Sequence, residues 1–441
     1  MSDLQIIYRN PEAISENPRN ARTHKPRQIR QIARSITAFG FANPVLIDEA
    51  DQLIAGHGRL AAAKALGLER VPVIQLLNLT DAQKRGLMLA DNKIAQNAGW
   101  DLQMLANELS DLSALELDFD IEDTGFDMGE IDLVIGDGDG AEGTSEPESA
   151  PEPDPAAAAI TEIGDLWELG AHRVVCGNAR SADDVKRLMD EGVADAIFTD
   201  PPYNVPIRGH VSGKGAVKHR EFSEASGEMS AEAFKVFLSE TLENAAVNCR
   251  HGAVVFACMD WRHVTALAEV GVAAIGPLIN LCVWVKTNGG MGSLYRSQHE
   301  LVCVFVRTGA SHRNNVQLGR YGRNRTNVWR YPGVNSFGAG RMEELRAHPT
   351  AKPVAMVKDA LLDVTRRGDV VLDPFAGAGA TLMAAERSGR YARLLEIDPL
   401  YVDVMLRRWR EETGEDPVRV RDGVTLSELE TMLQDREGSD V

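Results

Sequence analysis

One stretch constrains the fold more than any other: an apolar run that stops at two adjacent prolines, residues 194–204. The run Ala-Asp-Ala-Ile-Phe-Thr is short and mostly apolar, which predicts a buried strand. Pro201 and Pro202 cannot continue a strand ladder, because proline has no backbone N–H. Asp200 therefore stands at the carboxyl end of a strand and Tyr203 in the stiff turn after it, where open α/β sheets bind ligands.

These four residues suit the activation of an exocyclic amine on a nucleobase. The Asp200 carboxylate and the Pro201 carbonyl can each accept one N–H, which localises the lone pair on nitrogen for attack on an electrophilic carbon. The Tyr203 ring offers a face on which a flipped base can stack. The alternative is a strand with an ordinary proline-rich turn. The stretch resembles the Asp-Pro-Pro-Tyr motif of amino-group DNA methyltransferases, which implies catalytic roles for Asp200, Pro201, Pro202 and Tyr203.

A second strand, a glycine-rich turn and a helix are predicted from residue 369 onward. Gly377-x-Gly379 has Leu382 where a third glycine would complete the dinucleotide fingerprint, which argues against NAD. The turn suits a nucleotide ligand without a pyrophosphate, and S-adenosyl-L-methionine is one. It resembles the cofactor motif of the same methyltransferases, which implies cofactor contacts by Asp373, Phe375, Gly377 and Gly379.

A third strand ends in acids, within residues 391–399. Glu396, or Asp398 as a second candidate, can accept both ribose hydroxyls of an adenosyl group. The sequence His-Pro-Thr-Ala-Lys-Pro at 348–353 is typical of a helix start with proline in its first turn. It also resembles the family's His-Pro-Thr-x-Lys-Pro segment, which lines the methionine end of the cofactor and implies Thr350 and Lys352.

The resemblance covers residues 161–412, and the tetrad precedes the glycine motif, as in the β group of these enzymes. It implies an α/β, Rossmann-like, S-adenosylmethionine-dependent methyltransferase domain. The expected reaction is methyl transfer to N6 of adenine in duplex DNA, because Asp is typical of the first tetrad position in the adenine group. Cytosine N4 is the alternative, since its group typically has Ser there. Homodimers are common in the β group.

Target recognition in that family lies between the two motifs, about residues 288–345 here. The segment 307–330 holds six arginines and no acid. Arginine binds phosphate, or forks onto guanine O6 and N7. The alternative is a charged, solvated loop. The predicted DNA-contacting residues are Arg313, Arg320, Arg323, Arg325 and Arg330.

Residues 1–100 predict a small α+β domain, with a helix over 26–39 at apolar spacing and a capping box of Thr80 with Gln83. Asn-Pro-Arg at 17–19 and Gly-His-Gly-Arg at 56–59 resemble the ParB/sulfiredoxin superfamily, in which this turn faces a nucleotide phosphate.

The resemblance of this first domain implies a nucleoside triphosphate site at Gly56, His57 and Arg59. ParB proteins usually have Gly-Glu-Arg-Arg here, and this chain keeps one arginine of that pattern. Sulfiredoxins have a reactive cysteine here, and its absence argues against that activity. An alternative of another class follows: a ParB-like, nucleotide-gated DNA-binding protein whose methyltransferase half is inactive.

The formal net charge of −18 is unexpected for a DNA-binding protein, but it is local. Residues 101–165 hold 20 acids and no Lys or Arg, and the rest of the chain carries about +2. Apolar spacing predicts short helices over 101–134, and Gly, Pro, Ser, Glu and Ala predict a disordered linker over 136–159. A passive tether is favoured over an acidic DNA mimic.

The length of 441 residues predicts two or three domains. We expect a ParB-like domain over 1–100, an acidic segment over 101–160, the methyltransferase over 161–412 and a tail over 413–441. The five cysteines form no C-x-x-C pair, and no apolar stretch approaches a membrane span of about 18 residues. The expectation is a reduced, cytoplasmic protein without structural zinc or a membrane segment.

Overall fold

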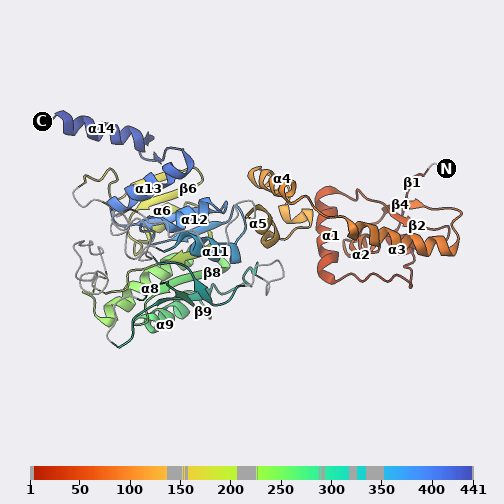
Figure 1. The fold of residues 1–441 in the computed structure, drawn as a ribbon, viewed down its shortest axis with the longest axis horizontal. Coiled ribbons are helices and arrows are strands. Elements are labelled where there is room, and N and C mark those ends of the chain that lie inside the picture. Colours follow the sequence, from red (N-terminus) through yellow and green to blue (C-terminus); the bar gives the residue numbers. More distant parts are fainter. Residues whose placement is uncertain are drawn as a thin grey trace. The chain divides into compact units, whose positions relative to one another are not determined.

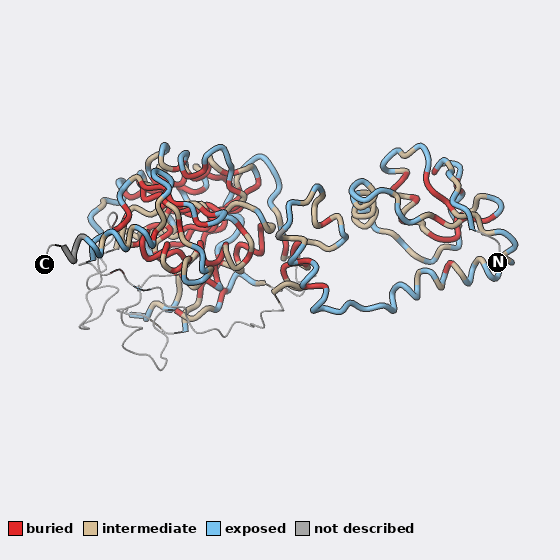
Figure 2. The backbone as a smooth tube through the Cα atoms, turned by 90° about the horizontal axis from the view of Figure 1, so that it is seen from above, coloured by how far each residue is buried: buried red, intermediate tan, exposed pale blue. Residues whose placement is uncertain are grey.

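The computed structural model comprises two compact units, residues 1–140 and 141–441. Each has its own sheet (Figure 1), and in each the buried residues form the interior (Figure 2). The residues that the structure describes are 4–136, 151, 153, 157–205, 225, 227–287, 289, 294–316, 325–333 and 352–439.

The first unit contains a four-stranded sheet in the order β1-β4-β2-β3. The inner strand β4 (Val71–Gln75) pairs antiparallel with β1 (Ile6–Arg9) and parallel with β2 (Val45–Ile47). The strand β3 (Leu53–Ala55) pairs antiparallel with β2. Valine, leucine and isoleucine side chains of these strands are buried against Leu60, which forms the core of this small α+β domain.

Three helices belong to this sheet: α1 (Pro26–Phe39), α2 (His57–Ala65) and α3 (Asp81–Asn97). The predicted span of α1 agrees with the observed one. The predicted capping box is also present, because Gln83 N–H donates to Thr80 Oγ1 at 3.2 Å and Thr80 N–H donates to Gln83 Oε1 at 2.9 Å.

Short helices follow in the same unit, where apolar spacing predicts them: α4 (Leu102–Ala114), η2 (Ile121–Thr124) and α5 (Met128–Gly136). They share a small core of their own, to which α4 and α5 contribute buried leucine, methionine and isoleucine side chains. Burial of this apolar surface explains why an acidic segment folds into helices here.

The second unit contains an eleven-stranded mixed sheet. Its centre, β8, β7, β12, β13 and β6, is parallel, while β10 pairs antiparallel with both β8 and β9. In sheet order the strands are β11 (Val328–Arg330), β9 (Leu278–Val285), β10 (His299–Val306), β8 (Cys249–Met259), β7 (Ala194–Thr199), β12 (Val370–Asp373), β13 (Tyr391–Glu396), β6 (His172–Cys176), β5 (Leu166–Leu169), β14 (Val418–Arg419) and β15 (Val424–Thr425).

Helices cover both faces of this sheet. Consecutive side chains of its central strands point to opposite faces, and apolar side chains on both faces are buried against helices. Ile197 of β7 belongs to the core cluster that contains α8, while its neighbour Phe198 belongs to the cluster that contains α11. The predicted α/β Rossmann-like fold is confirmed. One face carries α6 (Ala182–Met189), α8 (Ala231–Val247) and α9 (Val264–Ala274), and the other α11 (Val354–Val364), α12 (Ala380–Glu386) and α13 (Pro399–Thr413).

The sheet continues beyond residue 412, where the sequence analysis expects only a tail. The β14–β15 hairpin pairs with β5 through Val418 and Glu168, and α14 (Leu426–Ser439) follows it. Strands of two residues are too short to show a hydrophobic period, so the sequence carries no signal for them.

All five cysteines are buried free thiols. Within the described ranges, no helix is long and apolar enough to cross a membrane. The same residues contain no group of three or more His, Cys, Asp or Glu side chains that could hold a metal ion.

Candidate active site

Three carboxyl groups line one edge of the central sheet. Asp200 follows β7 directly, Asp373 closes β12 and Glu396 closes β13. These strands are parallel neighbours, so their carboxyl ends meet at the same edge. The structure thus brings together the catalytic and cofactor residues that the sequence predicts from separate stretches.

The turn after β7 is fixed by Asn204, which has a positive φ of 53°. Its side-chain Oδ1 accepts the backbone N–H groups of Gly227 at 3.1 Å and Met229 at 3.2 Å. Its Nδ2 donates to the Met229 carbonyl at 2.9 Å. Pro201 is buried within this turn and its ring fixes φ, so the Pro201 carbonyl is held rigidly.

Tyr203 lies with its hydroxyl between two carboxylates. Its oxygen is 2.7 Å from Asp200 Oδ1 and 3.1 Å from Glu300 Oε2. Burial raises the pKa of Tyr203 well above its ordinary value, and the charges of Asp200 and Glu300 raise it further. The hydroxyl is therefore a neutral donor, and its ring packs against core side chains on both sides of the sheet.

Lys352 contacts the Asp200 carboxylate directly. Its ammonium is 2.5 Å from Asp200 Oδ2 and 3.0 Å from Glu300 Oε2, and its side chain is 4% exposed. Burial would lower the pKa of Lys352, but the two carboxylates raise it, so the lysine is charged.

Glu300 and Lys286 belong to this cluster, although the sequence analysis did not single them out. Lys286 Nζ is 2.5 Å from Glu300 Oε1. Burial would raise the pKa of Glu300, but Lys352 and Lys286 together lower it to about 2. The only signal in the sequence was a glutamate at the second position of the apolar strand β10. Its place in this cluster depends on β10 lying beside β8 in the sheet.

On the cofactor side, Asp373 holds the start of the glycine turn. It accepts the Phe375 N–H at 3.0 Å and the Thr381 hydroxyl at 2.6 Å. Burial raises the pKa of Asp373 to about 7, although both hydrogen bonds oppose the rise. The Phe375 ring lies against Phe237 of α8, with ring centroids 5.8 Å apart.

Glu396 is held by two backbone donors, Gly377 N–H and Asp398 N–H, each at 2.9 Å. Burial raises the pKa of Glu396 to about 7 against these bonds. Asp398 has a different position, because its Oδ1 accepts the Leu400 N–H at 3.1 Å and caps α13. This geometry favours Glu396 over Asp398 as the ribose partner.

The two glycines of the turn have different structural reasons. Both have positive φ, 52° for Gly377 and 84° for Gly379. A Cβ on Gly379 would lie 2.6 Å from Met405 Cγ, whereas a Cβ on Gly377 would meet no heavy atom within 4 Å. Gly379 therefore permits packing against α13, and the space beside Gly377 is open.

A family model described as DNA methylase, of the N6/N4 type, matches residues 194–407, a span that contains the tetrad, the glycine turn and Glu396. Residues 194–407 therefore form a domain of the N6/N4 family of DNA methylases. The resemblance stated from the sequence is confirmed. In this methylase the ParB N-terminal domain model matches residues 3–93, and a ParB-methyltransferase HTH domain model matches residues 103–170.

Three curated relatives agree with this division. The first domain is 51% identical over 82 residues to the ParB-like nuclease domain-containing protein YnaK of Escherichia coli K12. This alignment covers 19% of the methylase and 94% of YnaK. The DNA adenine methyltransferase YhdJ of the same strain is 28% identical over 260 residues, 54% of the methylase and 82% of YhdJ. The type II methyltransferase M.HpaI of Haemophilus parainfluenzae is 24% identical over 254 residues, 54% and 74% of the two chains.

Among solved structures, the M1.HpyAVI–SAM complex matches 53% of the methylase and 97% of its own chain, with 18% sequence identity and a TM-score of 0.39.

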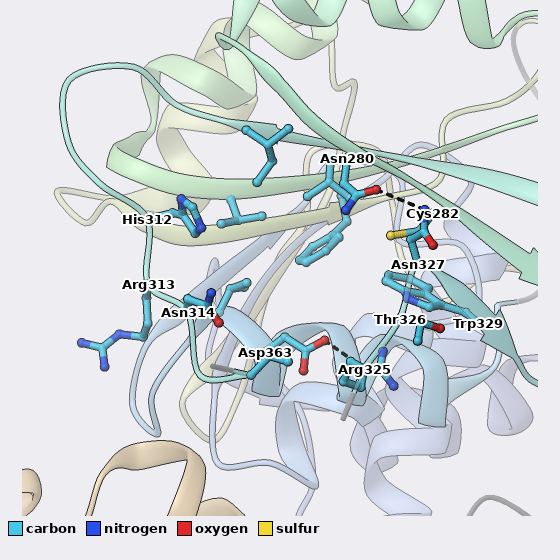
Figure 3. A pocket seen from close by; sticks show the side chains of 16 residues that line it. Asn280, Cys282, His312, Arg313, Asn314, Arg325, Thr326, Asn327, Trp329 and Asp363 are labelled. Carbon is cyan, nitrogen blue, oxygen red and sulfur yellow. Dashed lines mark hydrogen bonds and ion pairs between the residues drawn. The ribbon is translucent and has the colours of Figure 1, made fainter. Parts of the chain in front are cut away.

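The predicted DNA-contacting arginines of the methylase have unequal environments. Arg325 forms ion pairs with two acids of α11, at 3.0 Å from Asp363 and 2.9 Å from Asp359. Arg325 and Asp363 line a cavity of about 200 Å³ (Figure 3). This pairing argues against a phosphate contact by Arg325, because its charge is already neutralised. Arg330 is exposed on β11 and Arg313 is partly exposed. Arg320, Arg323 and the cofactor candidate Thr350 lie outside the described residues.

The predicted nucleotide turn of the ParB-like domain stands at the start of α2. Gly56 has a φ of 100°, and a Cβ there would lie 2.7 Å from Val45 Cγ1. Arg59 Nη2 donates to the Pro44 carbonyl at 3.3 Å. Two buried nitrogens, His57 Nε2 and Arg59 Nε, have no hydrogen-bond partner among the described residues.

Proposed function

We propose that the methylase transfers a methyl group from S-adenosyl-L-methionine to the N6 amine of adenine in duplex DNA. The position of Asp200 carries the proposal. Its carboxylate stands at the end of β7, beside the ends of β12 and β13, where the residues predicted to hold the cofactor lie. An acceptor for an amine N–H and a cradle for a nucleoside thus share one sheet edge.

The residues around the β12 turn fit the cofactor. Gly377 leaves open space, and Glu396 keeps acceptor capacity for ribose hydroxyls beyond its two backbone bonds. Lys352, which the sequence predicts at the methionine end of the cofactor, instead pairs with Asp200 and Glu300. When bound, the cofactor supplies an electrophilic methyl group: the electron pair of the amine nitrogen bonds to carbon, the pair of the carbon–sulfur bond stays on sulfur, and nitrogen releases one proton.

The residues of the chain orient the amine and take up that proton. Asp200 accepts one N–H and the rigid Pro201 carbonyl accepts the other, which directs the lone pair toward the methyl carbon. Burial raises the pKa of Asp200 even though the Lys352 charge opposes it. A carboxylate with a raised pKa is suited to receive the proton that the methylated nitrogen loses.

The choice of adenine rests on Asp200 at the first tetrad position, and the printed name of YhdJ, a DNA adenine methyltransferase, agrees with it. Cytosine N4 remains the second candidate, because its amine offers the same two N–H donors to the same acceptors.

Two further assignments belong to this proposal. Exposed Arg330 and partly exposed Arg313 contact the DNA phosphates. The turn at Gly56, with unpartnered nitrogens on His57 and Arg59, faces a nucleoside triphosphate at the start of α2.

The test is transfer of labelled methyl to unmethylated duplex DNA by wild type, Asp200→Asn and the exposed-site control Asp183→Asn, with nucleoside analysis of the product. We expect label in N6-methyladenine, loss of at least about 100-fold in Asp200→Asn, and an unchanged rate in the control. Label in N4-methylcytosine would replace the base. No label from wild type would refute the proposed activity.

A further inference from the structure

We propose that Glu300 is a positioning residue for methyl transfer: as a second carboxylate for the Lys352 ammonium, it keeps Asp200 able to accept the amine N–H of the base. The inference rests on the proposed function, because it assigns a role within that site. Glu300 acts through Lys352 and is not itself assigned a contact with the base.

The geometry places one ammonium between two carboxylates. Lys352 Nζ lies 2.5 Å from Asp200 Oδ2 and 3.0 Å from Glu300 Oε2. If Lys352 had only Asp200 as a partner, it would form an undivided ion pair with the acceptor that the amine needs. A charge-assisted hydrogen bond of that kind competes with a neutral N–H donor, which binds a carboxylate more weakly.

The four charged side chains balance. Lys286 and Lys352 face Asp200 and Glu300, and Lys286 binds the far oxygen of Glu300 at 2.5 Å. Both ammonium groups also lie over the Trp284 ring, at 4.6 Å and 5.7 Å from its centroid. The Lys352 and Glu300 side chains are 4% and 13% exposed, so their charges interact strongly, and the loss of the Glu300 carboxylate leaves a net positive site.

A net positive site opposes the reaction. The amine nitrogen gains positive charge as its electron pair bonds to the methyl carbon. An unbalanced lysine beside Asp200 would repel that developing charge and weaken the carboxylate that stabilises it. The rate of the chemical step should therefore depend on the charge of Glu300, although Glu300 is assigned no contact with the base and acts through Lys352.

A purely structural ion pair makes a different prediction. Replacing one partner of a buried pair lowers stability, and restoring neutrality with an apolar residue often restores it. A positioning role predicts in addition a selective loss of kcat in protein that is folded and binds cofactor.

The experiment compares Glu300→Gln, Glu300→Asp and the double variant Glu300→Gln/Lys286→Met with wild type. The matched control is Glu269→Gln, which breaks an ion pair with Lys235 in the same unit through a side chain that is 68% exposed. Thermal unfolding and S-adenosylmethionine binding are measured on every variant, so that kinetic effects are read only from folded protein.

We expect Glu300→Gln to lower kcat about 100-fold while the KM for DNA changes several-fold less. Glu300→Asp keeps the charge and should recover most of the rate. The double variant removes the excess positive charge but leaves Lys352 with Asp200 as its carboxylate partner, so it should exceed Glu300→Gln by only about two- to three-fold. Glu269→Gln should match wild type.

The pH profile gives an independent readout. The charge of Glu300 is one of the causes that raise the pKa of Asp200, after burial, so Glu300→Gln should move the acid limb of kcat to lower pH. The groups that face Asp200 in this cluster are Tyr203, Cys258, Glu300, Lys352 and Asp373.

Three results would overturn the inference. The first is an unchanged kcat in folded Glu300→Gln. The second is a double variant as fast as wild type, because net charge alone, and not the second carboxylate on Lys352, would then be the cause. The third is a wild-type protein that methylates no DNA, which refutes the proposed function as well and is thereby distinguished from the other two.

Discussion

The pKa values of the carboxyl groups in this site shift in opposite directions. The number of cations in contact with each carboxyl group decides the direction of its shift. Glu300 touches two lysines and its pKa falls to about 2. Glu396 is held by backbone N–H groups alone, and burial raises its pKa to about 7. Neutral hydrogen bonds offset less of the cost of burying a charge than ammonium groups do.

The pH dependence of stability follows from Glu396. Its folded pKa of about 7 exceeds its ordinary 4.5, so the folded protein binds the proton more tightly than the unfolded chain. The free energy of unfolding should therefore fall as pH rises from about 4.5 to 7 and should not depend on this group at higher pH. Glu396→Gln should flatten that decline in urea titrations from pH 4.5 to 8, and should weaken cofactor binding.

The exposed-site variant Glu191→Gln is the control for Glu396→Gln. An equal pH dependence in wild type and Glu396→Gln would show that other carboxyl groups cause the decline.

At the scale of elements, α13 fastens the beginning of the second unit. Asp403 accepts the backbone N–H groups of Ile160 at 2.8 Å and Thr161 at 3.0 Å, and the Thr161 hydroxyl at 2.6 Å. All three residues are buried, and Asp403 is more than 240 positions away in sequence. One side chain thus joins the start of the domain to a helix near its end.

Asp403→Ala should lower the free energy of unfolding by about 3 kcal/mol, because it leaves buried N–H groups without a partner. Chemical denaturation of the whole chain measures this loss. Glu411→Gln, at an exposed position of the same helix, should change stability by less than about 0.5 kcal/mol. A loss of the same small size in Asp403→Ala would contradict the anchoring role.

The acidic segment of the first unit forms ion pairs with α1, and its charge does not suit contact with a phosphate backbone. Arg27 of α1 is 2.6 Å from Asp127, and Arg34 is 3.5 Å from Asp123. The HTH domain model matches this region, yet residues 101–165 contain no Lys or Arg. Without cations the segment cannot neutralise phosphates, so its charge favours a protein contact over DNA.

At the scale of the whole molecule, the chain is two units with separate cores. The three large clusters that flank the eleven-stranded sheet lie entirely within residues 160–426, and the ParB-like sheet has its own cluster. Domains with complete cores fold independently in general. The contact of Ile160 and Thr161 with Asp403 shows that the second unit includes these two residues.

A protein of residues 157–441 should therefore unfold cooperatively within about 3 °C of the corresponding transition of the full chain, and bind S-adenosylmethionine equally well. Differential scanning calorimetry and cofactor titration check both expectations. A version that begins at residue 166 removes the Asp403 partners and should be less stable. A 157–441 protein that does not fold would show that the first unit supports the second.

Several local features of this protein could be predicted from its sequence. Two prolines end β7 after Asp200, paired glycines follow β12, and Thr80 with Gln83 starts α3. Each depends on backbone chemistry within a few residues, so each can be read without knowing what lies nearby.

Contacts between side chains that are distant in sequence could not be predicted in this way. Glu300 and Lys286 join the charged cluster around Lys352 because β10 and β9 lie beyond β8 in the sheet, and Arg325 forms ion pairs with acids of α11. Hydrophobic period and turn residues identify an element and its buried face, but they carry no information on strand order. Strand order fixes which charges share a buried site, and thereby the charges that surround Asp200.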